Sequence, residues 1–199
     1  GSITATLEAD SLALTANGAI SITEANAVTL TGVTQLNTNS PFSLVAGGNI
    51  TVDAALALTG TLGSITLTAN NSGTLTINSV LSTTSGNMTF TSAGATSLTS
   101  TARVTSTSGN VTFSSGGALT MHGDVVVNAG SGLISLAAAG SITLGKLRTT
   151  STSDFNITST NGAIIDGGEG DFDISAPNAK LVLRAATGIG IGANGALET

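Results

Sequence analysis

Apolar and polar residues alternate along almost the whole chain, in short triplets of the form apolar–polar–apolar. In an extended strand, the outer two side chains of such a triplet point to one face and the middle side chain points to the other. Turn-forming residues separate the triplets, and apolar residues are not spaced by three and four as in an amphipathic helix. The pattern therefore predicts many short β-strands and no helix.

The triplets recur with a nearly constant period. Gly109 opens the phrase GNVTF, and one period later Gly132 opens GLISL. The same step separates GALTM, which begins at Gly117, from GSITL, which begins at Gly140. The step is about 23 residues, and a fixed period of roughly 20–50 residues is typical of proteins built from stacked repeats. The period is therefore the main clue to the fold.

Three series of strands share this period. The first series starts at Leu12, Phe42, Ile65, Met88, Val111, Ile134, Phe155 and Leu181. The second series, whose strands each follow a corner glycine, starts at Ile20, Ile50, Leu75, Thr96, Leu119, Ile142, Ile164 and Ile189. The third and looser series consists of Val28, Leu56, Val80, Ala102–Val104, Val125–Val127, Leu147, Phe172–Ile174 and Leu197.

Three short strands per turn and about eight turns predict an all-β fold, a parallel β-helix that forms one domain over residues 1–199. The general preference for right-handed crossovers between parallel strands predicts that this β-helix is right-handed. The outer residues of the first series then stack as apolar ladders through the core, for example Ile65, Met88, Val111 and Ile134. The corner glycines are expected where the backbone is left-handed or otherwise strained and where a Cβ would clash. Because the step from Leu12 to Phe42 is longer than the common period, residues 31–41 are predicted to form a loop insertion or a short added strand.

Composition narrows the partners of this fold. Charged residues make up 8% of the chain, with five lysines and arginines and a net charge of −6, so neither nucleic acid nor anionic lipid is an expected partner. The absence of cysteine excludes disulfides and cysteine-bound metal centres, and no apolar run is long enough to cross a membrane. No cofactor is expected. Both ends lie within a repeat, so the chain is expected to be a fragment whose partners are neighbouring repeats of the same polypeptide.

The repeated phrases have a common form: GNITV from Gly48, GSITL from Gly63, GNMTF from Gly86 and GNVTF from Gly109. They resemble the repeats of filamentous haemagglutinin-like proteins, which are large bacterial adhesins secreted by the two-partner route. The resemblance covers nearly the whole chain and implies a β-helical shaft, a location outside the cell or on its surface, and no catalytic residues. The NPN motif of the family's secretion domain does not occur in the chain. The resemblance therefore concerns the shaft alone.

His122 is the only histidine, and Asp124 lies two residues after it. A histidine metal site needs further ligands, and a Ser–His–Asp triad is recognised by a geometry that nothing in the sequence indicates. We therefore interpret His122 as a solvent-facing corner residue.

The only acidic cluster in the sequence reads DGGEGDFD. Its carboxylates, on Asp166, Glu169, Asp171 and Asp173, are weak candidates for binding a divalent cation such as Ca²⁺. The run departs from the glycine-rich calcium repeat because Phe172 stands where an aspartate belongs, and because the phrase occurs once. The favoured interpretation is a solvated acidic corner.

A glycan-active enzyme is the obvious catalytic alternative for a β-helix. Such enzymes need carboxylates on one outer sheet and use aromatic residues to stack on sugars. The middle residues of the first series are instead mostly hydroxyl-bearing, as at Thr66, Thr89 and Thr112. The third series carries Arg103, Lys146 and Arg148, which we interpret as surface charges. The sequence therefore predicts no enzyme.

Two binding functions remain as alternatives. Rows such as Thr66 with Thr68 resemble the flat threonine arrays of ice-binding β-solenoids, although threonine is also a favoured strand residue. A direct binding module for a glycan or a host protein, on the β-helix face or on the 31–41 insertion, is the main alternative. The favoured function is mechanical: a shaft segment that presents the binding regions of a bacterial adhesin away from the cell.

Overall fold

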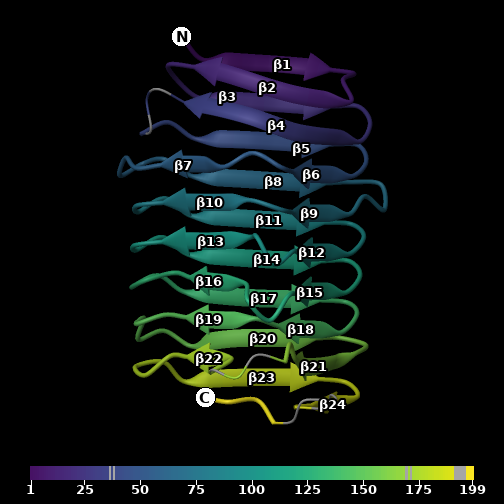
Figure 1. The fold of residues 1–199 in the computed structure, drawn as a ribbon, viewed down its shortest axis with the longest axis vertical. Helices are drawn as coiled ribbons and strands as arrows, with labels where there is room; N and C mark the ends of the chain where they lie inside the picture. The colour runs from purple at the N-terminus through teal and green to yellow at the C-terminus, as the bar shows by residue number, and fades with distance from the viewer. Residues whose placement is uncertain (36, 38, 169, 171, 191–195) are drawn as a thin grey trace.

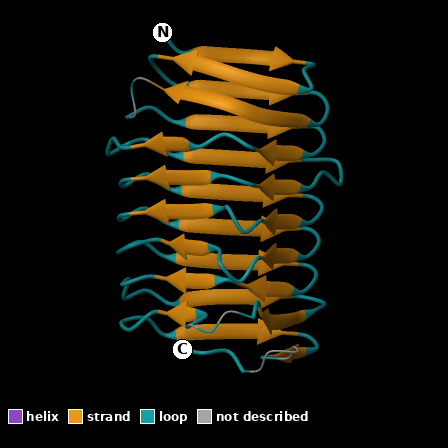
Figure 2. Cartoon of the chain, in the orientation of Figure 1, coloured by secondary structure: helices purple, strands orange, loops and turns teal. Residues whose placement is uncertain are grey.

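The computed structural model describes residues 1–35, 37, 39–168, 170, 172–190 and 196–199. Within them the chain is all-β and contains no helix. It forms a parallel β-helix, a rod in which the strands of successive turns stack and the termini lie at opposite ends (Figure 1). Loops connect the strands at the corners of each turn (Figure 2). The predicted β-helix of about eight turns, with three strands in most turns, is confirmed.

The strands form three parallel sheets, named A, B and C. Sheet A consists of β1 (Ile3–Leu7), β3 (Ile20–Glu24), β5 (Phe42–Ala46), β8 (Ile65–Ala69), β11 (Met88–Ser92), β14 (Val111–Ser115), β17 (Ile134–Ala138), β20 (Phe155–Ser159) and β23 (Leu181–Ala185). Sheet B consists of β2 (Ser11–Ala16), β4 (Val28–Gln35), β6 (Ile50–Val52), β9 (Leu75–Ile77), β12 (Thr96–Leu98), β15 (Leu119–Met121), β18 (Ile142–Leu144), β21 (Ala163–Asp166) and β24 (Gly188–Ile189). Sheet C consists of β7 (Leu56–Leu58), β10 (Val80–Thr83), β13 (Arg103–Ser106), β16 (Val126–Asn128), β19 (Lys146–Arg148) and β22 (Ile174–Ser175).

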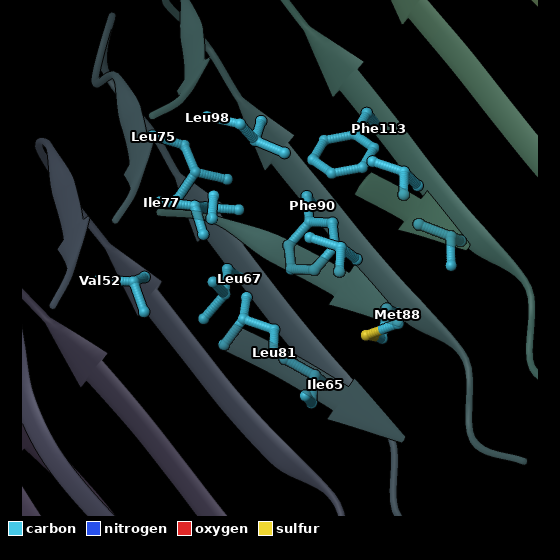
Figure 3. Close-up of a cluster of buried hydrophobic side chains, with 14 of the residues drawn as sticks. Val52, Ile65, Leu67, Leu75, Ile77, Leu81, Met88, Phe90, Leu98 and Phe113 are labelled. Carbon is cyan, nitrogen blue, oxygen red and sulfur yellow. The ribbon is translucent and has the colours of Figure 1, made fainter. Parts of the chain in front are cut away.

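Side chains stacked in register build the core. In sheet A, Met88 lies between Ile65 and Val111, and Phe90 pairs with Phe113. The rings of Phe90 and Phe113 are 4.6 Å apart between centroids. Figure 3 shows buried side chains from all three sheets meeting in this core. The predicted apolar ladders are confirmed, and because a single turn cannot bury its own apolar face, stability depends on stacking.

The first two turns differ from the prediction. Leu12, expected in the first series, lies in β2 of sheet B, and Ile20, expected in the second series, begins β3 of sheet A. The strands β2 and β4 are long, with six and eight residues, and the described part of sheet C begins only with β7. The first two turns therefore have two strands instead of three. One long strand shows the same alternation as two short ones, so the sequence pattern does not distinguish them.

The main prediction for residues 31–41 was a loop, and the structure shows a loop in only part of this segment. Its first part, through Gln35, belongs to β4. Gln35 is buried, and its Nε2 donates a hydrogen bond of 2.7 Å to the carbonyl of Ser40, which ties down the turn that follows. In sheet A, Ile20 pairs directly with Phe42, a step close to the common period, so no insertion is needed there.

The corner glycines provide room for close packing between turns. Neither Gly94 nor Gly117 is among the described glycines with positive φ, so the expected left-handed backbone is wrong at these corners. A Cβ at Gly94 would lie 2.5 Å from the carbonyl oxygen of Ser72, and one at Gly117 would lie 2.9 Å from the amide nitrogen of Ala95. Successive turns thus approach too closely for any side chain.

Candidate functional site

The outward residues of sheet A form two parallel columns along the rod. The first column consists of Thr4, Ser21, Ser43, Thr66, Thr89, Thr112, Ser135, Asn156 and Val182. The second consists of Thr6, Thr23, Val45, Thr68, Thr91, Ser114, Ala137, Thr158 and Arg184. Hydroxyl groups dominate both columns, and no charged residue occurs in them before Arg184.

Sheet B adds one further outward column of the same kind. It consists of Ser11, Thr29, Thr51, Thr76, Ser97, Thr120, Thr143 and Ile165. Within the described chain, the hydroxyls of these three columns donate no hydrogen bond to another protein group. They differ in this from the buried corner hydroxyls of Thr83 and Ser106, which bond to each other. The faces of sheets A and B therefore offer their hydroxyls to solvent.

Sheet C carries three of the five lysines and arginines. Arg103 and Lys146 occupy one outward column, and Arg148 follows Asn128 in the next. The guanidinium of Arg103 donates to two backbone carbonyls just before it in the chain, at 3.0 and 2.7 Å. No acidic residue lies among the paired outward positions of this sheet. The predicted surface charges thus share one face, the most basic of the three.

A groove of about 410 Å³ lies beside this face, at the corner where sheet C passes into sheet A. One wall is formed by Ser82, Thr105 and Asn128, which are aligned in the outward column of sheet C. The lining also includes Thr84 and Thr107, which follow the ends of β10 and β13. The lining is rich in hydroxyls and includes no charged residue.

The predicted acidic cluster is only partly brought together. Carboxylate oxygens of Asp166, Asp173 and Glu198 all lie within 4.8 Å of one another. Asp166 and Asp173 are buried, so the interpretation as a solvated corner is wrong for these two residues. Glu169 and Asp171 lie outside the described residues. The three clustered carboxylates could hold a divalent cation, since Ca²⁺ and Mg²⁺ prefer oxygen ligands.

Backbone donors stabilise this cluster. Oδ1 of Asp166 accepts the N–H of Gly168 at 2.6 Å, and Oδ2 of Asp173 accepts the N–H of Glu198 at 3.0 Å. Hydrogen bonds to the carboxylates offset part of the cost of burying them. The cluster is therefore integrated into the last turn of the rod.

Sequence reasoning missed Glu198, which lies far along the chain from Asp173 and reaches it only because the chain makes a further turn. Leu197, the residue before Glu198, belongs to the third series, and this position could have indicated that Glu198 lies in a further turn. The seventh strand of the same series was predicted as Phe172–Ile174. Ile174 is buried and pairs with Leu147, as predicted, whereas Phe172 is 63% exposed and lies before the strand.

His122 and Asp124 face solvent at a corner, as predicted for His122. Nδ1 of His122 lies 3.5 Å from a carboxylate oxygen of Asp124 and accepts the backbone N–H of Asp124 at 3.2 Å. The pair forms a local turn.

Glu24 is a buried carboxylate that the sequence analysis did not single out. It is 1% exposed and stacks between Leu7 and Ala46 in the last inward row of sheet A. Its Oε2 accepts the N–H of Ala9 at 2.9 Å, and Oε1 lies 3.4 Å from the amide nitrogen of Asn26. Glu24 therefore closes the first corner of the rod, which is a structural role.

Comparison of the chain with protein-family models, with curated proteins and with solved structures finds no match. In the described part of the chain, no helix is long and apolar enough to span a membrane. The resemblance to filamentous haemagglutinin-like repeats rests on the repeated phrases alone.

Proposed function

We propose that the chain is a shaft segment of a large bacterial surface or secreted adhesin, which extends the protein and presents binding regions away from the cell. The observation that supports this best is the continuity of sheet A, whose nine strands are paired in parallel at every step from β1 to β23. At about 4.8 Å per strand, these steps span about 38 Å. One apolar core runs through the same turns. A load along the axis is therefore shared by backbone hydrogen bonds at every turn.

The lateral faces of sheets A and B suit this role. Between Thr4 and Thr158, their paired outward positions hold no acid, base or aromatic ring. Threonine and serine on a pleated surface favour the strand conformation and keep the face hydrated. The proposal includes no catalytic activity. It includes a location outside the cell, which is based on the resemblance of the repeats.

The two ends of the rod suit a segment that continues into neighbouring turns. Apolar residues that are only partly buried against the core gather in the terminal turns, for example Ile3, Ala5 and Leu7 at one end and Leu181, Leu183 and Ala185 at the other. An apolar groove of about 470 Å³ at the second end is lined by Phe172, Pro177 and Leu181, among others. Such edges are covered by adjacent repeats in solenoid proteins. Neighbouring repeats of the same polypeptide are therefore the proposed partners.

Changing the length of the rod by whole turns tests the proposal. Residues 86–131 comprise two full turns, so a copy inserted after residue 131 adds strands to all three sheets in register. The longer chain should fold and gain about 10 Å in maximum dimension by small-angle X-ray scattering. A C-terminal epitope should then stand farther from a surface to which the N-terminus is tethered.

The matched control is a copy of residues 86–119, about one and a half turns, which places every following strand out of register. We expect that variant to unfold at lower temperature and to gain no regular length. If the two-turn variant collapsed, or held the epitope no farther from the surface, the shaft proposal would be wrong.

Binding to ice is a second candidate, favoured by the alignment of Thr66 and Thr68 with Thr89 and Thr91. From β1 to β20 the two columns form a charge-free array, spaced about 4.8 Å along the rod and about 6.6 Å across it. Thermal hysteresis that is lost in Thr89→Tyr and retained in Thr120→Tyr, on sheet B, would support ice binding by sheet A. Freezing behaviour equal to that of a non-binding protein would reject it.

A further inference from the structure

We infer that the groove between sheets C and A is a binding site for a linear polysaccharide that carries carboxylate groups. A shaft requires no ligand of its own, so this inference goes beyond the proposed function and does not depend on it. It rests on three features of the described residues: hydroxyls left available in the groove, their repeat along the rod axis, and a free guanidinium beside them.

The hydroxyls on the floor of the groove form hydrogen bonds within the protein, and in the rest of the lining the hydroxyl of Thr84 donates to the carbonyl of Thr59 at 2.8 Å, whereas three other hydroxyls are left available. On the floor, the hydroxyl of Thr83 donates to the carbonyl of Gly86 at 2.7 Å and lies 3.0 Å from Oγ of Ser106. Elsewhere in the lining, the hydroxyls of Ser82, Thr105 and Thr107 make no hydrogen bond to a described protein group. These three hydroxyls can therefore bond to a ligand.

Asn128 adds an oriented donor to the same wall. Its Oδ1 accepts the N–H of Gly130 at 2.9 Å, which fixes the plane of the amide. The Nδ2 group, which makes no hydrogen bond to the described protein, is left to donate outward. A donor that is held in place loses less entropy when it binds a ligand than a freely rotating side chain does.

The polar groups repeat along the rod. Ser82, Thr105 and Asn128 lie on successive strands and are aligned by their Cα pairing, so they recur about every 4.8 Å. The lining extends from β7 to β16, a distance of about 14 Å. A row of this length suits an extended chain with repeating hydroxyls, lying parallel to the axis, better than it suits a compact molecule.

The charge beside the groove indicates that the ligand is anionic. Arg148 follows Asn128 in the same outward column and is exposed, and its guanidinium makes no hydrogen bond or ion pair with a described residue. Arg103 and Lys146 lie on the same sheet face, although the chain as a whole carries a net charge of −6. A planar guanidinium can bind a carboxylate through two parallel hydrogen bonds.

The residues that line the groove favour acidic polysaccharides over other linear polymers as its ligand. Its lining holds no aromatic side chain, so a neutral polysaccharide would find no ring on which to stack. Single-stranded nucleic acid also depends on aromatic stacking and on a longer basic track than three cations provide. Carboxylated sugar chains need only hydrogen-bond partners and a cation, and the groove offers both.

The test is a calorimetric titration of the whole chain at low salt with an oligogalacturonate, and with its methyl ester, in which each carboxylate is replaced by an uncharged ester. We expect the uronate to bind and the ester to bind far more weakly. Arg148→Gln should weaken uronate binding by about tenfold or more, because the charge-assisted hydrogen bonds to the carboxylate are lost. Thr105→Val, which keeps the shape of the side chain, should weaken binding by about threefold to tenfold.

Arg184→Gln is the matched control, because Arg184 is an exposed cation on sheet A, away from the groove. It should leave uronate binding unchanged. Equal losses of uronate affinity in the Arg148→Gln and Arg184→Gln variants would mean that net charge alone causes the effect, and this would overturn the proposed site. Absence of uronate binding, equal binding of the methyl ester, or equal binding of single-stranded DNA would each overturn it as well. Circular dichroism spectra identical to that of the unmodified chain ensure that the variants are compared in the folded state.

Discussion

Thr83 and Ser106 lie one turn apart and join two successive corners of the rod through a buried hydrogen bond, with 3.0 Å between their hydroxyl oxygens. Oγ of Ser106 also accepts the N–H of Gly109 at 2.8 Å. The contact stands where sheet C passes into sheet A, on the floor of the groove. Side-chain bonds therefore connect the turns at corners where the sheet hydrogen bonds end.

The substitution Ser106→Ala should lower the free energy of unfolding by about 1–3 kcal/mol, because it leaves the buried N–H of Gly109 without its acceptor. Urea denaturation measures the loss. Ser108→Ala is the control, since Ser108 is exposed and makes only a 3.4 Å contact with the carbonyl of Thr84. Equal stability of the two variants would show that the buried bond contributes nothing.

The substitution Gly109→Ala should destabilise the rod by about 1–3 kcal/mol, because the added Cβ would overlap the carbonyl oxygen of Gly86 in the turn before. Gly32→Ala provides the contrast, since a Cβ at Gly32 would lie 3.6 Å from the Cβ of Ala13, an ordinary contact. Thermal unfolding followed by circular dichroism compares them. A Gly109→Ala variant as stable as Gly32→Ala would contradict the close approach of the turns.

The stacked rings of Phe90 and Phe113 should be energetically coupled. Each change to Ala should cost about 3–5 kcal/mol, because both side chains are fully buried. In a double-mutant cycle the pair should show a coupling of about 0.5–1.5 kcal/mol beyond the burial of area. A parallel cycle of Phe90 with Phe155, with which it makes no described ring contact, should be close to additive. Additivity in both cycles would mean that the ring contact itself adds no stability.

Glu24→Ala should lower the free energy of unfolding by about 1–3 kcal/mol, because the partly buried N–H of Ala9 loses its acceptor. Glu24→Gln keeps an acceptor oxygen at the same place and should retain most of the stability. The exposed Glu8 supplies a control, and Glu8→Ala should unfold as the unmodified chain does in guanidinium titrations. If Glu24→Ala proved as stable as Glu8→Ala, the carboxylate would have no capping role.

Much of the fold could be predicted because the pattern that produces it, the alternation of apolar and polar residues, is local and repeats along the chain. The alternation at Ile65–Leu67 and Met88–Phe90 indicates which side chains face inward, and the constant period places one row over the next. The candidate sites were less predictable. Nothing in the sequence near Asp173 indicates that Glu198 lies beside it, since the contact depends on the last turn of the rod.

The sequence by itself determined that the chain is a stack of short parallel strands around an apolar core. The reason is that apolar residues recur with a constant period, and one turn can bury its apolar face only against the next turn. Only the tertiary structure decided which sheet each early strand joins, since Leu12 and Ile20 carry the same alternation in either place. It also decided which atoms of the neighbouring turn approach each corner glycine, and that Arg148 lies beside the hydroxyl groove. These features arise between residues of different turns, where distance is set by stacking and not by separation along the chain.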